Sequence, residues 1–253
     1  MESLQEVRQK LRRSYQLKNE LVRLEQQRQE LSERLAVCRY TKREAEAALL
    51  EYEHGGVKRL LDKLTGKWEE KREELSRDVR NASGALEGVQ RAAAETERMI
   101  VSARQELAAL EGLEVEYAPL FEAEPGLREL RDRLEALHCA IHLAPLLEEN
   151  DKALKTAGRL AKGDVIGELS MEEHDQNLWF SRADTLAQEC RGLLERIAQC
   201  GILLEIHPYF ANPAGYIMSA TRSGRLDRLN HALDAIWEAK HQIKELCYQL
   251  AEE

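Results

Sequence analysis

The chain turns back on itself between two long helical patterns, at His54-Gly55-Gly56-Val57-Lys58-Arg59-Leu60-Leu61-Asp62-Lys63-Leu64-Thr65-Gly66. Two adjacent glycines favour the end of a helix, because glycine has a low helix propensity and adopts backbone conformations closed to other residues. A third glycine closes the stretch, and the helical patterns on its two sides have nearly equal length. We therefore predict an antiparallel helical hairpin with its tip at residues 54–67.

The arm before the tip carries an apolar seam with heptad spacing. Its positions alternate by four and three residues through Leu17, Leu21, Leu24, Arg28, Leu31, Leu35, Cys38, Lys42, Ala45, Leu49 and Tyr52. This spacing is typical of a coiled coil and continues for about five heptads, with Arg28 and Lys42 as exceptions. Leu4, Val7, Leu11 and Tyr15 extend the seam backwards, but with a shift of phase.

The arm after the tip carries a second seam with the same spacing, through Trp68, Arg72, Leu75, Val79, Ala82, Leu86, Val89, Ala93, Thr96, Ile100, Ala103, Leu107, Leu110, Glu114 and Tyr117. Equal arms favour pairing within one chain, because a parallel dimer would leave the two tip glycines in the middle of a rod. Gly84 and Gly88 lie off this seam, one turn apart. They are either tolerated defects or a site where a third helix packs closely.

Shorter helical patterns follow the hairpin. Prolines at 119 and 125 end the second arm, and Pro145 is expected to interrupt the pattern between residues 127 and 160. Further helical patterns cover residues 170–200, 213–223 and 226–250. We predict an all-α fold, with a long antiparallel coiled-coil hairpin over residues 1–118 followed by a smaller helical bundle over residues 119–253.

The composition narrows the class of function. The 253 residues include 33% charged and 5% aromatic side chains, as is typical of long helices, and their net charge of -9 argues against nucleic-acid binding. No apolar run predicts a signal peptide or a membrane span, and the five scattered cysteines are expected to be reduced thiols. We therefore expect a cytoplasmic protein.

Histidines and carboxylates suggest one enzymatic alternative. Glu135 with His138, and Glu238 with His241, form Glu-x-x-His pairs of the kind that hold two metal ions in a four-helix bundle. Such pairs arise by chance at this composition, and both flank an apolar stripe instead of lying in it. His138 and His142 have a spacing that suits zinc, but nothing marks further ligands. The sequence therefore predicts no catalytic, metal or cofactor residue, and a metal-dependent bundle enzyme is an alternative.

The tip contains Gly66-Lys67, the dipeptide that ends a phosphate-binding loop. Trp68 stands where that loop needs Ser or Thr for magnesium, and Leu61 stands where it needs its first glycine. This mismatch excludes a nucleotide-binding loop at the tip. The sequence contains no other family motif, and heptads alone assign no family.

The tip is nevertheless the candidate partner-binding site. An apolar stripe with helical spacing is surrounded by basic residues, the whole set being Val57, Leu60, Leu61, Leu64 and Trp68 with Lys58, Arg59 and Lys63. An exposed basic amphipathic turn suits an anionic membrane or an acidic partner. In the other interpretation, the stripe folds back and caps the end of the seam, and the lysines are merely solvated.

These patterns predict a non-enzymatic coiled-coil interaction or scaffold protein, which binds a protein partner or a second copy of itself through its helices. The main alternative is a peripheral membrane-associated protein that uses the basic tip or the basic residues 8–13.

Overall fold

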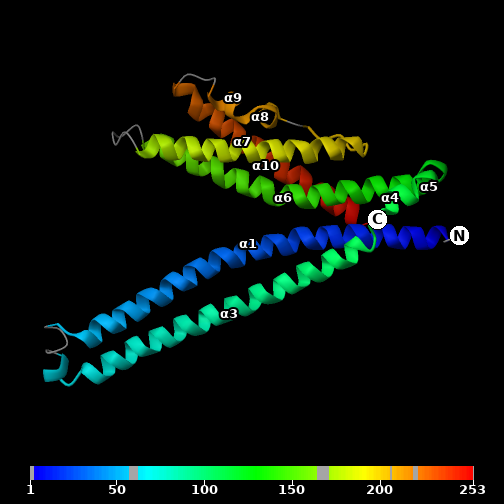
Figure 1. The fold of residues 1–253 in the computed structure, drawn as a ribbon. Coiled ribbons are helices and arrows are strands. Elements are labelled where there is room, and N and C mark those ends of the chain that lie inside the picture. The colour runs from blue at the N-terminus through cyan, green and yellow to red at the C-terminus, as the bar shows by residue number, and fades with distance from the viewer. Residues whose placement is uncertain (1–2, 57–61, 164–170, 206, 219–221, 253) are drawn as a thin grey trace. The chain divides into compact units, whose positions relative to one another are not determined.

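The computed structural model describes residues 3–56, 62–163, 171–205, 207–218 and 222–252. The regular elements of these residues are helices, so the predicted all-α class is confirmed (Figure 1). The chain divides into two compact units, which we call the hairpin unit, residues 20–109, and the bundle unit, residues 1–19 with 110–253. The first helix contributes to both. The sequence analysis placed a domain boundary after residue 118 because the heptad pattern ends there. The two units described here are defined instead by which residues contact one another.

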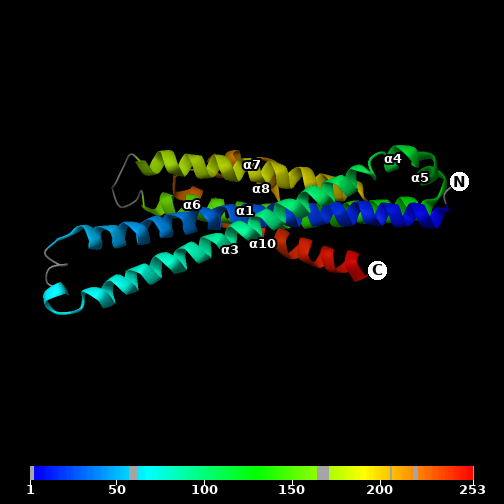
Figure 2. The ribbon, with the colours of Figure 1, turned by 60° about the horizontal axis from the view of Figure 1, so that its bottom comes forward.

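The hairpin unit consists of α1 (Leu4–His54), from residue 20 onwards, and α3 (Trp68–Ala108). The two arms lie side by side in both views of the fold (Figures 1 and 2). Three ion pairs join the arms: Glu25 with Arg104, Arg28 with Glu97, and Glu53 with Arg72. As the residue number increases along α1, the number of the partner in α3 decreases. The arms are therefore antiparallel, and the predicted coiled-coil hairpin is confirmed.

The heptad seam forms the contact between the arms. Leu24 and Leu31 of α1 are buried, as are Val89 and Ile100 of α3. Most other seam positions, such as Leu86, are half-buried. Two helices cover only one stripe of each other, so the rest of each helix surface faces water.

The second arm ends at Ala108 instead of continuing to Tyr117 as predicted. Gly112 follows with a φ of 91°, a left-handed conformation that favours glycine, and redirects the chain into the short helix α4 (Leu113–Glu116). The helix α5 (Ala118–Ala123) comes next. The heptad continues past Ala108 in the sequence, but its last residues belong to a different core.

That core belongs to the bundle unit and gathers residues from both ends of the hairpin sequence: Val7, Leu11, Tyr15, Leu113, Tyr117, Phe121 and Leu127. The shift of heptad phase after Tyr15 lies a few residues before the boundary of the two units, which falls between Asn19 and Glu20.

Three long helices make up most of the bundle unit: α6 (Pro125–Gly163), α7 (Met171–Gln199) and α10 (Arg222–Glu252). Ion pairs of Glu135 with Arg196 and of Glu149 with Arg182 show that α7 is antiparallel to α6.

The helix α10 is also antiparallel to α6. Lys240 pairs with Glu148, while Leu229, eleven positions earlier, lies at Gly158, ten positions later. A Cβ at Gly158 would lie 2.5 Å from Leu229 Cδ2, so glycine allows the two helices to approach closely here. Large side chains between the three helices are fully buried, including Leu143, Leu147, Leu154, Leu186, Ile197 and Ile236.

Two further features of the bundle differ from the sequence pattern. Pro145 lies inside α6 without ending it, contrary to the predicted interruption. A proline removes one backbone donor, and the burial of both flanks keeps the helix continuous here. Residues 201–205 are non-helical and lead to the short helices α8 (Pro208–Ala211) and α9 (Pro213–Met218).

Candidate functional site

The tip begins where α1 ends at His54. Gly55 and Gly56 have φ values of 126° and 141°, which L-amino acids rarely adopt, so this glycine pair stops the helix as predicted. The predicted site residues Val57, Lys58, Arg59, Leu60 and Leu61 lie outside the described residues. The other three predicted site residues, Lys63, Leu64 and Trp68, are described and define the geometry of the tip.

A glycine-capped turn holds Leu64 away from the protein. The Lys67 amide donates to the Asp62 carbonyl at 2.9 Å, and the Gly66 amide donates to the Lys63 carbonyl at 3.4 Å. With Gly66 at a φ of 73°, these bonds form a Schellman motif, which is a common end of a helix. Leu64 sits in the last helical turn before this cap and is 84% exposed.

Trp68 opens α3 and is half-buried. The Lys63 ammonium lies 5.1 Å from its ring centre and the Arg72 guanidinium 5.5 Å, both within cation–π range. The structure thus separates two residues that the sequence pattern placed on one stripe, because Trp68 is sheltered by cations whereas Leu64 is not.

Two polar contacts lie behind the tip. The Tyr52 hydroxyl of α1 donates to Asp62 Oδ2 of the tip at 2.9 Å, and Arg72 Nε of α3 donates to Glu53 Oε1 of α1 at 2.8 Å. The first contact holds the tip to the first arm, and the second joins the two arms. The sequence analysis missed both contacts, because heptad spacing does not show which polar residues of the two arms meet.

The bundle unit contains a cluster of titratable side chains around Glu135 on α6. Its carboxylate accepts hydrogen bonds from Arg196 and from the Cys139 thiol, and it interacts with Tyr15. Burial raises the pKa of Glu135, but Arg196 and these hydrogen bonds lower it more strongly, so the net pKa lies below the usual value. Burial also raises the pKa of Cys139 to about 12, so this thiol is protonated at neutral pH and is a poor nucleophile.

His138 lies in the same region. One of its ring nitrogens, Nδ1, is 2.8 Å from the Asn19 side-chain oxygen, and its ring packs against the edge of Tyr15. Burial is the main cause that lowers the pKa of His138, and Lys18, His142 and Arg196 act in the same direction; against the opposite effect of Glu135, they bring it to about 4. His138 is therefore neutral at physiological pH.

The metal-site candidates are occupied by other interactions. Glu135 binds Arg196, while His241 on α10 pairs with Glu245 and stacks on Trp237. Within the described ranges, no group of three or more His, Cys, Asp and Glu residues is arranged to hold a metal ion.

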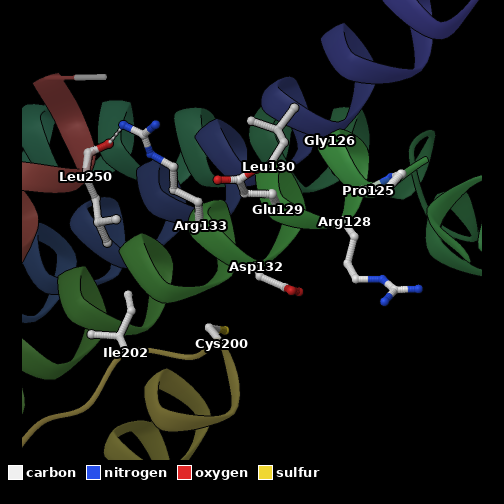
Figure 3. Close-up of a pocket in the computed structure, with 10 residues that line it drawn as sticks. All are labelled: Pro125, Gly126, Arg128, Glu129, Leu130, Asp132, Arg133, Cys200, Ile202 and Leu250. Carbon is white, nitrogen blue, oxygen red and sulfur yellow. Dashed lines mark hydrogen bonds between the residues drawn. The ribbon is translucent and has the colours of Figure 1, made fainter.

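An open groove of about 590 Å³ lies between the start of α6, the residues after α7 and the end of α10 (Figure 3). Two of its polar side chains have neighbouring partners: Asp132 pairs with Arg131 at 2.6 Å, and Arg133 donates to the Leu250 carbonyl at 2.9 Å. Cys200 and Ile202 form part of its apolar lining. The sequence analysis missed this groove because its walls come from three distant segments.

Gly84 and Gly88, the predicted contact for a third helix, lie on the exposed surface of α3. A Cβ at either position would have no atom within 4 Å among the described residues. No described helix packs there, so this surface is open.

Comparisons with protein-family models, with curated proteins and with solved structures found no match. Among the helices that the structure describes, none is long and apolar enough to cross a membrane.

Proposed function

We propose that this chain is a non-enzymatic interaction protein that binds another helix along one side of its hairpin. The partner is a second protein or a second copy of the chain. The observation that carries the proposal is a difference between the two sides of the hairpin unit, which the heptad positions define.

One side is charged and bridged by ion pairs. Glu25 and Arg104 both follow directly after a d position, Leu24 or Ala103, so both occupy e positions, and their 2.7 Å contact places the e positions of the two arms beside each other. The Arg28–Glu97 and Arg72–Glu53 pairs join a to e and lie on this side too. We call it the ion-paired side.

The g and c positions of both arms then share the opposite side. The central stretch of this side carries small or apolar residues, namely Val37, Thr41, Ala85, Gly88 and Ala92, and the charged Arg34 and Glu44 flank it along α1. Val37 is 64% exposed, and Gly88 leaves open space above the backbone. We call these five residues the open side.

The open side suits a helical partner for two physical reasons. Small residues allow helix axes to approach more closely than the usual 8–10 Å, and an uncharged strip can be buried without removing charges from water. The non-enzymatic part of the proposal is supported by the Glu135 cluster, whose polar groups bond to each other and whose thiol is protonated.

Substitutions on the two sides test the proposal. Val37→Arg and Gly88→Arg place a charge on the open side, whereas Val101→Arg changes an exposed residue at a b position on the other side. We expect the first two to abolish self-association in sedimentation equilibrium, or crosslinking to a partner in cells, with unchanged helicity in circular dichroism. The proposal is wrong if Val101→Arg has the same effect, or if no variant changes association.

A further inference from the structure

The open side is nearly symmetric about one level of the hairpin. Two of the ion pairs between the arms lie far apart along the hairpin, namely Glu25 with Arg104 and Glu53 with Arg72. The level halfway between them, which we call the centre, falls at residue 39 in α1 and at Gly88 in α3. The other residues of the open side lie at nearly equal distances before and after the centre: Val37 and Thr41 on α1, and Ala85 and Ala92 on α3.

The charges that flank the open side follow the same symmetry. Arg34 and Glu44 are exposed and lie five residues before and five residues after residue 39. If a two-fold axis crosses the helices at the centre, the α1 helices of two copies run antiparallel, and Arg34 of each copy faces Glu44 of the other. Glu44 also accepts a hydrogen bond from Tyr40 of its own arm, but a carboxylate has room for a second donor.

Positions farther from the centre on the same side of the hairpin also suit this arrangement. Glu30 of one copy faces Ala48 of the other, since both lie nine residues from residue 39. Likewise Asn81 faces Glu95 on α3, because each lies seven residues from Gly88. Like charges placed opposite each other would oppose the pairing, whereas each of these contacts joins a charged residue to a neutral one.

The flanking charges distinguish this arrangement from the other symmetric one. A two-fold axis parallel to the helices places α1 of one copy over α3 of the other, where Arg34 faces Ala92 and Glu44 faces the uncharged residues 81–85. Both charges would then be covered by neutral residues, at a cost in lost hydration. Charge complementarity therefore favours α1 stacked antiparallel on α1.

The area of this side of the hairpin matches a second copy better than a single foreign helix. Between residues 27 and 51 it is about 36 Å long, and two helices together are about 20 Å wide, which gives roughly 700 Å². A specific interface buries about 800 Å² of each partner. A single helix, about 10 Å wide, would cover only half of this width, whereas a second hairpin covers both arms.

We propose that the partner of the open side is a second copy of this chain, packed antiparallel about the centre. This inference rests on the proposed function and names the partner of the same surface. Val37 of each copy packs against Thr41 of the other, and Arg34 pairs with Glu44 at both ends of this contact. Gly88 lies at the centre, where the open space above its backbone lets the two α3 helices approach closely.

Charge reversal tests this pairing in sedimentation equilibrium of the chain. We expect the wild type to form dimers. Arg34→Glu and Glu44→Arg should each weaken the dimer about ten- to thirtyfold, because each change turns two attractive contacts into repulsive ones. The two changes combined should restore the dimer to within about threefold of the wild type, since the reversed charges attract again.

A matched control uses Glu33→Arg and Arg43→Glu, which reverse exposed charges ten residues apart on α1 at f and b positions, away from the open side. Neither change should weaken the dimer. A photocrosslinker at position 48 should join the second copy near residue 30. A crosslink to α3 of the second copy, or a double reversal as weak as the single ones, would overturn the antiparallel pairing.

The same measurements separate this pairing from the proposed function. If the chain stays monomeric at the highest attainable concentration while a photocrosslinker at position 37 joins another protein in cells, self-pairing is wrong and the proposed function stands. If the chain is monomeric and position 37 captures no protein in cells, both are wrong.

Discussion

The two units differ in how completely they bury their apolar residues. In the bundle unit, three helices enclose side chains such as Leu154 and Ile236, which have no exposed surface. In the hairpin unit, most seam residues retain part of their exposure, because each arm has only one neighbour in the unit. A bundle core is closed to further partners, whereas a two-helix rod keeps most of its surface available for binding. The two units thus differ in how much of their helix surface is left uncovered, and our proposal uses the uncovered surface of the hairpin unit.

The largest expected effect on stability comes from a substitution in the bundle core, and it tests the difference in burial between the two units. Ile236→Ala should lower the free energy of unfolding of the bundle unit by about 2–5 kcal/mol, because it leaves a cavity among fully buried neighbours. Leu86→Ala in the hairpin seam should cost about 1 kcal/mol, since the leucine is half-buried and water replaces its lost contacts. Hydrogen exchange under native conditions reports each unit separately. Equal losses for the two variants would show that the burial contrast does not govern stability.

The second largest loss of stability is expected from removing a buried hydrogen bond in the bundle unit. The Tyr209 hydroxyl donates to Asn150 Oδ1 at 2.8 Å, and both residues are fully buried. Asn150 Nδ2 is already without a partner among the described residues. Tyr209→Phe should therefore cost about 1–3 kcal/mol in urea unfolding, because it leaves the Asn150 oxygen buried and unbonded as well.

The hairpin unit provides the control for this hydrogen bond. Tyr40 is 63% exposed and its hydroxyl interacts with Glu44, so Tyr40→Phe should change stability little, as water replaces the lost partner. Changing Asn150 to Leu together with Tyr209→Phe should recover part of the loss, because both polar partners are then removed. A large effect of Tyr40→Phe would contradict the contrast between the units.

The hairpin was predictable from the sequence because a coiled coil is a local, periodic object. The seam, the antiparallel pairing and the glycine tip all follow from spacing, and the structure confirms them. The sequence also held a signal for the second core, since the heptad phase shifts after Tyr15, a few residues before α1 passes from the bundle unit to the hairpin unit after Asn19. The end of α3 was misjudged because a periodic pattern does not reveal that Gly112 turns the chain.

The candidate site was harder to predict, since it depends on where particular side chains meet. The spacing placed Leu64 and Trp68 on one stripe, but only the folded structure shows that cations shelter Trp68 and that a capped turn exposes Leu64. The contact of Tyr52 with Asp62 and the groove beside Cys200 depend on tertiary packing, which leaves no spacing signal.

A third prediction concerns pH and the bundle unit. The pKa of His138 is lowered by burial to about 4, below its unfolded value of about 6.5, so the unfolded chain binds this proton more readily. The stability that His138 contributes is therefore present above about pH 6.5 and is lost as the pH falls towards 4. Because the side chain is only partly buried, we expect a loss of about 1–2 kcal/mol.

Urea unfolding at a series of pH values measures this loss. His138→Gln should unfold with a weaker dependence on pH than the wild type. Protonation of Glu135, whose pKa is lowered on balance, destabilises the bundle in the same direction at lower pH. If His138→Gln keeps the full pH dependence, this histidine is not the group responsible.

The smallest effect belongs to the ion pairs of the hairpin. Glu25 and Arg104 lie 2.7 Å apart, but both side chains are about half exposed, so water screens their attraction. Glu25→Gln should cost about 0.2–1 kcal/mol, and added salt should remove even this difference. Glu135→Gln should cost more and respond less to salt, because the Glu135 side chain is only 20% exposed and several donors share it. If the two substitutions respond alike to salt, the ion pairs of the two units have the same environment. If they differ as expected, the ion pairs between the two arms of the hairpin contribute little to its stability.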